Sequence, residues 1–225
     1  DKIYLGDIIE RNKIIKDKSI LDDILNIVSS SIGSLTNAGK IAKTFKSERQ
    51  VTISDDTVSR YLDFFIDAFM LYKANRYDVK GRKYIGSPLK YYFSDVGLRN
   101  ARLNFRQQEE NHIMENIIYN ELCIRDFTVD VGVVEYCYKD EHKKSKRTQL
   151  EIDFVANKGS KKYYIQSAYS IPSEEKREQE LASLLKISDS FKKIVVVGDE
   201  IMPYTDDDGI YFTGLFDFLL KDEWQ

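Results

Sequence analysis

Apolar residues recur at intervals of three and four between Ser19 and Phe69, which predicts three short amphipathic helices. Each helix follows a residue able to accept hydrogen bonds from first-turn amides: Ser19, then Thr36 or Asn37, then Ser54. The positions expected to be buried are Ile20, Ile24, Ile27, Val28, Ile41, Ala42, Phe45, Val58, Tyr61, Leu62, Phe65 and Phe69. Three short helices in succession favour a helix-turn-helix arrangement.

A strand-like pattern follows these helices. Residues 71–78 alternate apolar and polar, residues 80–82 form a turn signal, and residues 83–85 return as a second strand. A hairpin after three helices is the layout of a winged helix, here with Gly81 at the tip of the wing. We expect this module to occupy residues 19–87, with residues 1–18 forming a helix or the tail of a preceding module.

From residue 88 to residue 225 the pattern alternates between strands and helices. Strands are predicted at 91–93, 128–138, 148–156, 162–170 and 194–197, helices at 95–103, 113–122 and 173–186, and a last strand and helix within 210–220. Such alternation is typical of a mixed sheet covered by helices. The predicted fold class is therefore α/β (α+β overall): a winged helix-turn-helix followed by an α/β domain with a mixed sheet at 88–225.

Charge and hydropathy narrow the choice of partners. The formal net charge is −3, from 34 Lys and Arg against 37 Asp and Glu, so any contact with DNA depends on local basic patches. No apolar run approaches the roughly 20 residues that span a bilayer. We expect a cytoplasmic protein with no membrane contact.

Cysteine and histidine placement gives no sign of a metal site. Cys123 and Cys137 form no CxxC pair, and His112 and His142 lie far apart without the spacing of metal ligands. The sequence therefore predicts no metal in this chain and two reduced thiols.

The segments most informative about chemistry lie on two neighbouring predicted strands. They are Glu151-Ile152-Asp153-Phe154 and Ile165-Gln166-Ser167-Ala168. With a preceding helix that contains glutamates, they resemble the PD-(D/E)xK nuclease superfamily. Active members hold Mg²⁺ between carboxylates, the ligands that this ion prefers, and use a lysine to orient the attacking water.

That resemblance implies that residues 88–225 form a restriction-endonuclease-like domain, a nuclease scaffold without its catalytic groups. It assigns the first-strand aspartate to Asp153 and the helix glutamate to Glu115, whereas the second carboxylate and the lysine fall on Gln166 and Ala168. Neither Gln nor Ala supplies the required charge, so these four positions are expected to be vestigial. One alternative remains open, a residual Mg²⁺-dependent nuclease that uses Glu151, Asp153 and Glu115 with a migrated lysine at Lys161 or Lys162.

A second resemblance covers most of the chain. Its segments are Leu5 to Arg11, Asp78 to Gly81, Tyr91 to Asn100, His112 to Leu122 and Glu151 to Tyr169. Together they resemble the domain of unknown function that follows the ATPase module in bacterial and archaeal AAA-like proteins. This implies an ATPase module upstream, in cis, that binds ATP and Mg²⁺ and whose tail is residues 1–18. The chain itself has no GxxxxGK[ST] phosphate loop, so we expect it to be neither an enzyme nor a cofactor binder.

The winged helix suggests DNA as a partner. Candidate contacts are Thr57, Arg60, Lys80, Arg82 and Lys83, on the third helix and the wing. Acidic residues on the same helix oppose this interpretation: Asp55, Asp56, Asp63 and Asp67. The sequence therefore predicts a non-catalytic recognition region that docks DNA, and leaves open a protein-interaction or oligomerisation scaffold with an unknown protein partner.

Overall fold

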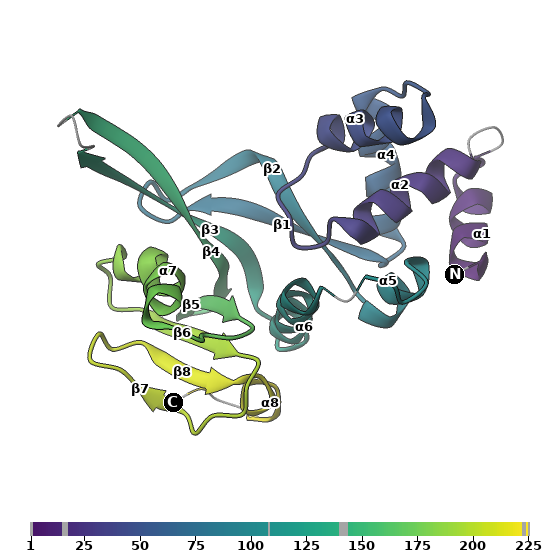
Figure 1. Cartoon of the computed structure of the whole chain (residues 1–225). Helices are drawn as coiled ribbons and strands as arrows, with labels where there is room; N and C mark the ends of the chain where they lie inside the picture. Colours follow the sequence, from purple (N-terminus) through teal and green to yellow (C-terminus); the bar gives the residue numbers. More distant parts are fainter. Residues whose placement is uncertain (1, 15–17, 108, 140–143, 222–223, 225) are drawn as a thin grey trace. The chain divides into compact units, whose positions relative to one another are not determined.

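The computed structural model describes residues 2–14, 18–107, 109–139, 144–221 and 224 (Figure 1). The chain divides into two compact units. Unit 1 comprises residues 1–74 and 87–116, and unit 2 comprises residues 75–86 and 117–225. His142 and Lys143 lie outside the described residues.

Unit 1 is built mainly from helices. These are α1 (Lys2–Arg11), α2 (Lys18–Ser30), α3 (Ala38–Arg49), α4 (Asp55–Asp67) and α5 (Val96–Arg102). The first turn of α6 (Glu110–Ile124) also belongs to this unit. Two strands contribute their ends, β1 (Leu71–Asp78) and β2 (Lys83–Phe93).

Side-chain caps fix where these helices begin. Asn37 accepts a hydrogen bond from the Lys40 amide at the start of α3, and Ser54 accepts one from the Thr57 amide at the start of α4. Asp95 caps α5 in the same way. Each cap satisfies an amide that has no partner within its helix. The sequence predicted the cap at Ser54 and the cap at Asn37, which is chosen over Thr36, but Ser19, expected to cap the first of the three helices, lies inside α2.

The apolar faces of α2, α3 and α4 form the core of unit 1 as their periodicity predicts, except that Ile20 is only half-buried and Phe69 is exposed. Phe69 is 76% exposed. Helix α4 ends at Asp67, and Phe69 follows the cap with a left-handed φ of 55°, so the helical repeat no longer directs its side chain inward. The prediction that Phe69 is buried was wrong.

Strand β2 is longer than predicted. It runs from Lys83 to Phe93 and includes both the segment 91–93, expected to be a separate strand, and the expected domain boundary at residues 86–88. Near its end, Leu89 pairs with Thr36 in an isolated antiparallel bridge within unit 1. The chain therefore continues as one strand across the segment that the sequence suggested as a linker.

Unit 2 is organised by a mixed sheet. Its remaining strands are β3 (Thr128–Lys139), β4 (Ser145–Lys158), β5 (Lys161–Ala168), β6 (Lys192–Val197), β7 (Tyr204–Thr205) and β8 (Tyr211–Gly214). The strand order is β2-β1-β3-β4-β5-β6-β8-β7. Strands β3, β4 and β5 form an antiparallel meander, whereas β5, β6 and β8 are parallel. The sheet also includes the predicted wing, because β1 pairs with β3 in parallel through Arg76 and Val131.

Helices cover the sheet of unit 2. Leu181 and Leu184 of α7 (Glu174–Leu185) pack with Val155, Tyr164 and Val195 in an apolar core on one face (Figure 1). Helix α8 (Leu215–Leu220) follows β8, and its Phe218 stacks on Trp224 with ring centres 4.3 Å apart. The described part of the chain thus contains eight helices and eight strands, which confirms a mixed α/β fold. None of its helices is long and apolar enough to span a bilayer.

Candidate functional site

Asp153 lies at an irregularity of the sheet. The register between β3 and β4 shifts there, so that Asp153 and Phe154 stand opposite the single residue Val131. A bulge of this kind redirects side chains out of the regular alternation. The Asp153 carboxylate is 8% exposed and accepts a hydrogen bond of 2.9 Å from the backbone amide of Ser167 on β5. The structure therefore brings Asp153 beside the strand segment where the resemblance places Gln166.

The other two positions on β5 have different surroundings: Ala168 lies in the apolar core, and Gln166 lies beside a carboxylate of α7. Ala168 is 3% exposed and belongs to the same apolar core as Leu181. The Gln166 amide nitrogen lies 3.4 Å from a carboxylate oxygen of Glu180 on α7, and its oxygen has no hydrogen-bond partner among the described residues. The space that a catalytic lysine would occupy is therefore filled by core packing.

Helix α7 adds two charged groups that the sequence did not single out. Glu180 forms an ion pair of 2.5 Å with Lys176, one turn earlier on the same helix. Their four-residue spacing is the only sequence signal for this pair. Lys161 and Lys162, the proposed migrated lysines, lie at the opposite end of β5, where Lys161 pairs with Lys158 in the strand register.

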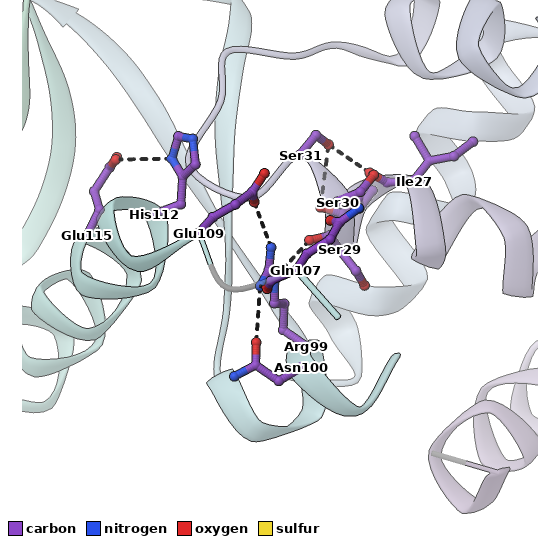
Figure 2. Close-up of polar contacts among 11 residues, drawn as sticks. Ile27, Ser29, Ser30, Ser31, Arg99, Asn100, Gln107, Glu109, His112 and Glu115 are labelled. Carbon is purple, nitrogen blue, oxygen red and sulfur yellow. Dashed lines mark hydrogen bonds and ion pairs between the residues drawn. The ribbon is translucent and has the colours of Figure 1, made fainter. Parts of the chain in front are cut away.

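Glu115 belongs to unit 1, where a cluster of polar groups surrounds its carboxylate. Lys90 Nζ lies 2.8 Å from Glu115 Oε1, and the Tyr92 hydroxyl donates to the same oxygen at 2.5 Å. His112 Nδ1 lies 3.8 Å from Oε2 (Figure 2). Burial alone would raise the pKa of Glu115, but the charge of Lys90 and the hydrogen bonds from its neighbours outweigh burial and lower it. Glu115 is therefore an ionised partner of Lys90.

A second buried charge in unit 1 is Arg99 on α5. Its side chain is fully buried and donates to the backbone oxygens of Ser29 and Gln107 and to the carboxylate of Glu109 at 2.8 Å (Figure 2). It also donates to the Asn100 side chain. These bonds connect the end of α2 to the segment between α5 and α6. Arg99 was part of the family resemblance, but nothing in the local pattern predicted its burial.

The DNA-contact candidates on α4 have little positive charge around them. Thr57 is half-buried and its hydroxyl lies 2.9 Å from that of Ser54, so it belongs to the helix cap. Arg60 is exposed and lies over the Tyr61 ring. A cavity of about 520 Å³ beside this helix is lined by Asp55 and Asp63 among others. This surface is poorly suited to phosphate.

The DNA-contact candidates on the hairpin include two that lie near another cation. Lys80 and Arg82 line a cavity of about 540 Å³ in unit 2, together with Lys162 of β5. Lys83 is exposed at the start of β2 and does not line this cavity. At the turn, Asp78 Oδ1 accepts a hydrogen bond of 2.8 Å from the Gly81 amide, which fixes the loop that carries Lys80 and Arg82.

Residues of the types that bind metal ions do not cluster in the part of the chain that the structure describes. No group of three or more His, Cys, Asp or Glu side chains there is arranged to hold a metal ion. Cys123 and Cys137 are free thiols, the first half-buried and the second exposed. Burial raises the pKa of Cys123, which keeps the thiol protonated.

The chain is similar in sequence to a domain of unknown function and to uncharacterized proteins. Residues 1–109 match a domain of unknown function (DUF8612). An uncharacterized protein from Haemophilus influenzae is 36% identical over 221 residues, 98% of this chain and 50% of that protein. The uncharacterized protein MJ1544 from Methanocaldococcus jannaschii is 28% identical over 209 residues, 89% of this chain and 43% of that protein.

One solved structure was also matched. The match to the crystal structure of protein VC1899 from Vibrio cholerae covers 88% of this chain and 53% of the VC1899 chain. The two chains are 12% identical, with a TM-score of 0.31. The chain spans about half the length of the curated relatives it matches, and residues 1–109 are similar to a domain of unknown function.

Proposed function

We propose that this chain is a non-catalytic recognition region that docks DNA and serves an AAA-like ATPase module in the same longer protein. The proposal that the chain is non-catalytic rests on the burial of Ala168. A lysine there would place an ammonium group in the apolar core beside Leu181, where an unpaired charge is strongly disfavoured.

The ATPase module is proposed from two observations. The chain resembles regions that follow such modules and contains no phosphate loop of its own. Because the chain covers 50% and 43% of its two relatives, each relative has room for another module of similar size. We therefore place ATP and Mg²⁺ binding in that other part.

The proposed fold of each module has separate support. Helices α2, α3 and α4 precede the β1–β2 hairpin, and the Thr36–Leu89 bridge ties the segment before α3 to the hairpin, as a winged helix requires. In unit 2, Asp153 lies on the strand next to Gln166, which agrees with a degenerate nuclease scaffold. We propose a winged helix and a nuclease-like domain on these grounds.

The experiment is a combined binding and cleavage assay with the purified 225-residue chain. Duplex, single-stranded and branched DNA are incubated with Mg²⁺ or Mn²⁺ across a salt series. We expect affinity that falls as salt rises, without cleavage products. Cleavage that Asp153→Ala abolishes would replace this proposal with the residual nuclease.

A protein-interaction role has one observation in its favour. Phe216 and Leu220 on α8 are 60% and 81% exposed, and Ile124 is 75% exposed. Exposed apolar side chains mark contact surfaces between proteins where they form a contiguous patch. Absence of salt-sensitive DNA affinity in the same assay would favour this second function.

A further inference from the structure

Cationic and aromatic side chains from distant parts of the sequence meet in one cavity of unit 2. Its volume of about 540 Å³ lies within the range of about 300–1,000 Å³ typical of small-ligand sites. The residues come from the β1–β2 hairpin, the start of β5 and the segment after α7. The lining is Tyr77, Val79, Lys80, Arg82, Lys162, Tyr164, Ile187, Ser188, Asp189 and Phe191.

The charge of this lining is positive. Lys80, Arg82 and Lys162 contribute three cations, and Asp189 contributes one carboxylate. That carboxylate accepts a hydrogen bond of 2.6 Å from the Tyr164 hydroxyl and another from the Phe191 amide. The two bonds hold Asp189 against the protein, and the cations remain available for an anion.

Two aromatic rings lie next to the cations. Lys162 Nζ is 4.9 Å from the centre of the Phe191 ring and 6.0 Å from the centre of the Tyr77 ring. Phe191 is 40% exposed, whereas Tyr77 is half-buried. An exposed ring beside cations is the combination that binds unpaired bases, since each base has a face to stack and an attached phosphate.

We propose that this cavity binds an unpaired nucleotide of single-stranded DNA, with the base stacked on Phe191 and Tyr77 and the phosphate held by Lys80, Arg82 and Lys162. The inference rests on the proposed DNA-docking function and names the form of DNA that the chain recognises. Duplex DNA keeps its bases stacked in the helix and cannot place one against Phe191 without flipping it out.

The cavity beside α4 offers a contrast, and the turn of the hairpin supports this choice. The cavity beside α4 contains Asp55 and Asp63 with Lys73 as its cation, so phosphate is repelled there. The hairpin carries Lys80 and Arg82 on a turn fixed by the bond between Asp78 and Gly81. A fixed turn presents its cations to a ligand at low entropic cost.

The test measures fluorescence anisotropy of a labelled 12-nucleotide oligothymidine, a 12-base-pair duplex and free dTMP as competitor, at 50 to 300 mM NaCl. The variants are Phe191→Leu, which keeps apolar volume but removes the stacking face, and Arg82→Gln. Phe216→Leu and Lys43→Gln are the matched controls, with an exposed ring and an exposed cation outside the cavity.

We expect Phe191→Leu to weaken single-strand binding about 5- to 100-fold and the two controls to leave it unchanged. Arg82→Gln should reduce the slope of log affinity against log salt by about 0.7, because one phosphate is no longer neutralised by the protein. Circular dichroism of each variant verifies that the fold is retained.

Three outcomes overturn the inference. Equal affinity for duplex and single strand, unaffected by Phe191→Leu, would reject the cavity while leaving DNA docking in place. Equal affinity for dTMP and the oligonucleotide would assign the cavity to a free nucleotide. No salt-sensitive binding to either the oligothymidine or the duplex would reject DNA docking itself, together with the inference.

Discussion

Lys90 Nζ lies 2.8 Å from Glu115 Oε1, and the two side chains are only 5% and 9% exposed. A charge pair so far from water depends on both partners, because each compensates the desolvation of the other. The pair joins the end of β2 to the first turns of α6 within unit 1. It gives Glu115 a structural role that does not depend on a metal.

Loss of one partner should destabilise unit 1. Replacing Glu115 by Ala leaves Lys90 as a buried charge without its carboxylate, which is expected to reduce the free energy of unfolding by about 3–5 kcal/mol. Urea denaturation followed by circular dichroism measures the change. Glu48→Ala, an exposed glutamate on α3, is the control and should change stability by less than about 0.5 kcal/mol. A similar effect of both variants would contradict the structural role.

Stability should depend on pH through His112. The adjacent Glu115 carboxylate, with a smaller contribution from Glu109, raises the His112 pKa above its ordinary 6.5, although burial and Lys90 act in the opposite direction. Because the folded state binds this proton more tightly, the contribution to stability is complete below pH 6.5 and is lost as pH rises through the folded-state pKa.

Urea unfolding between pH 5.5 and pH 8.5 tests this dependence. We expect His112→Gln to remove a decrease in stability that the unmodified chain shows as pH rises. The matched control is His142→Gln, which replaces the second histidine of the sequence. If both variants keep the decrease, His112 is not its source.

Introducing the missing lysine should harm the fold without creating activity. Ala168→Lys places a long cation in the core beside Leu181 and Val197, and we expect a loss of at least about 2 kcal/mol in the free energy of unfolding. Ala182→Lys, a half-buried position on α7, is the control for adding a lysine near this core and should be tolerated better. Mg²⁺-dependent cleavage by the Ala168→Lys variant would show instead that the scaffold can still accommodate catalysis.

The hairpin turn should tolerate no side chain at Gly81. A Cβ there would clash with Asp78 Oδ2, and Asp78 is itself buried and bonded to the Gly81 amide. Gly81→Ala is expected to cost about 1–3 kcal/mol and to increase amide hydrogen exchange across residues 78–83. Gly86→Ala, where a Cβ meets nothing within 4 Å, is the control in the same hairpin. Equal exchange in both variants would contradict a turn held by Asp78.

Local pattern predicted most elements but not how they pair. The caps at Asn37, Ser54 and Asp95 and the buried faces of α3 and α4 follow from hydrogen-bonding capacity and helical spacing over a few residues. The departure from the nuclease motif at Gln166 and Ala168 could likewise be read from residue identity. Phe69 was misplaced because the helical repeat was extended past the end of its helix.

The sequence by itself determined the elements, the helix caps and the identity of the replaced nuclease residues. Tertiary structure decided the parallel pairing of β1 with β3, the burial of Arg99, and the meeting of Lys80, Arg82 and Lys162 in one cavity. The physical reason is the sequence separation between the residues that interact. Caps and periodicity act between neighbours in the chain, whereas strand pairing and cavity formation join residues dozens of positions apart, and no local pattern records those contacts.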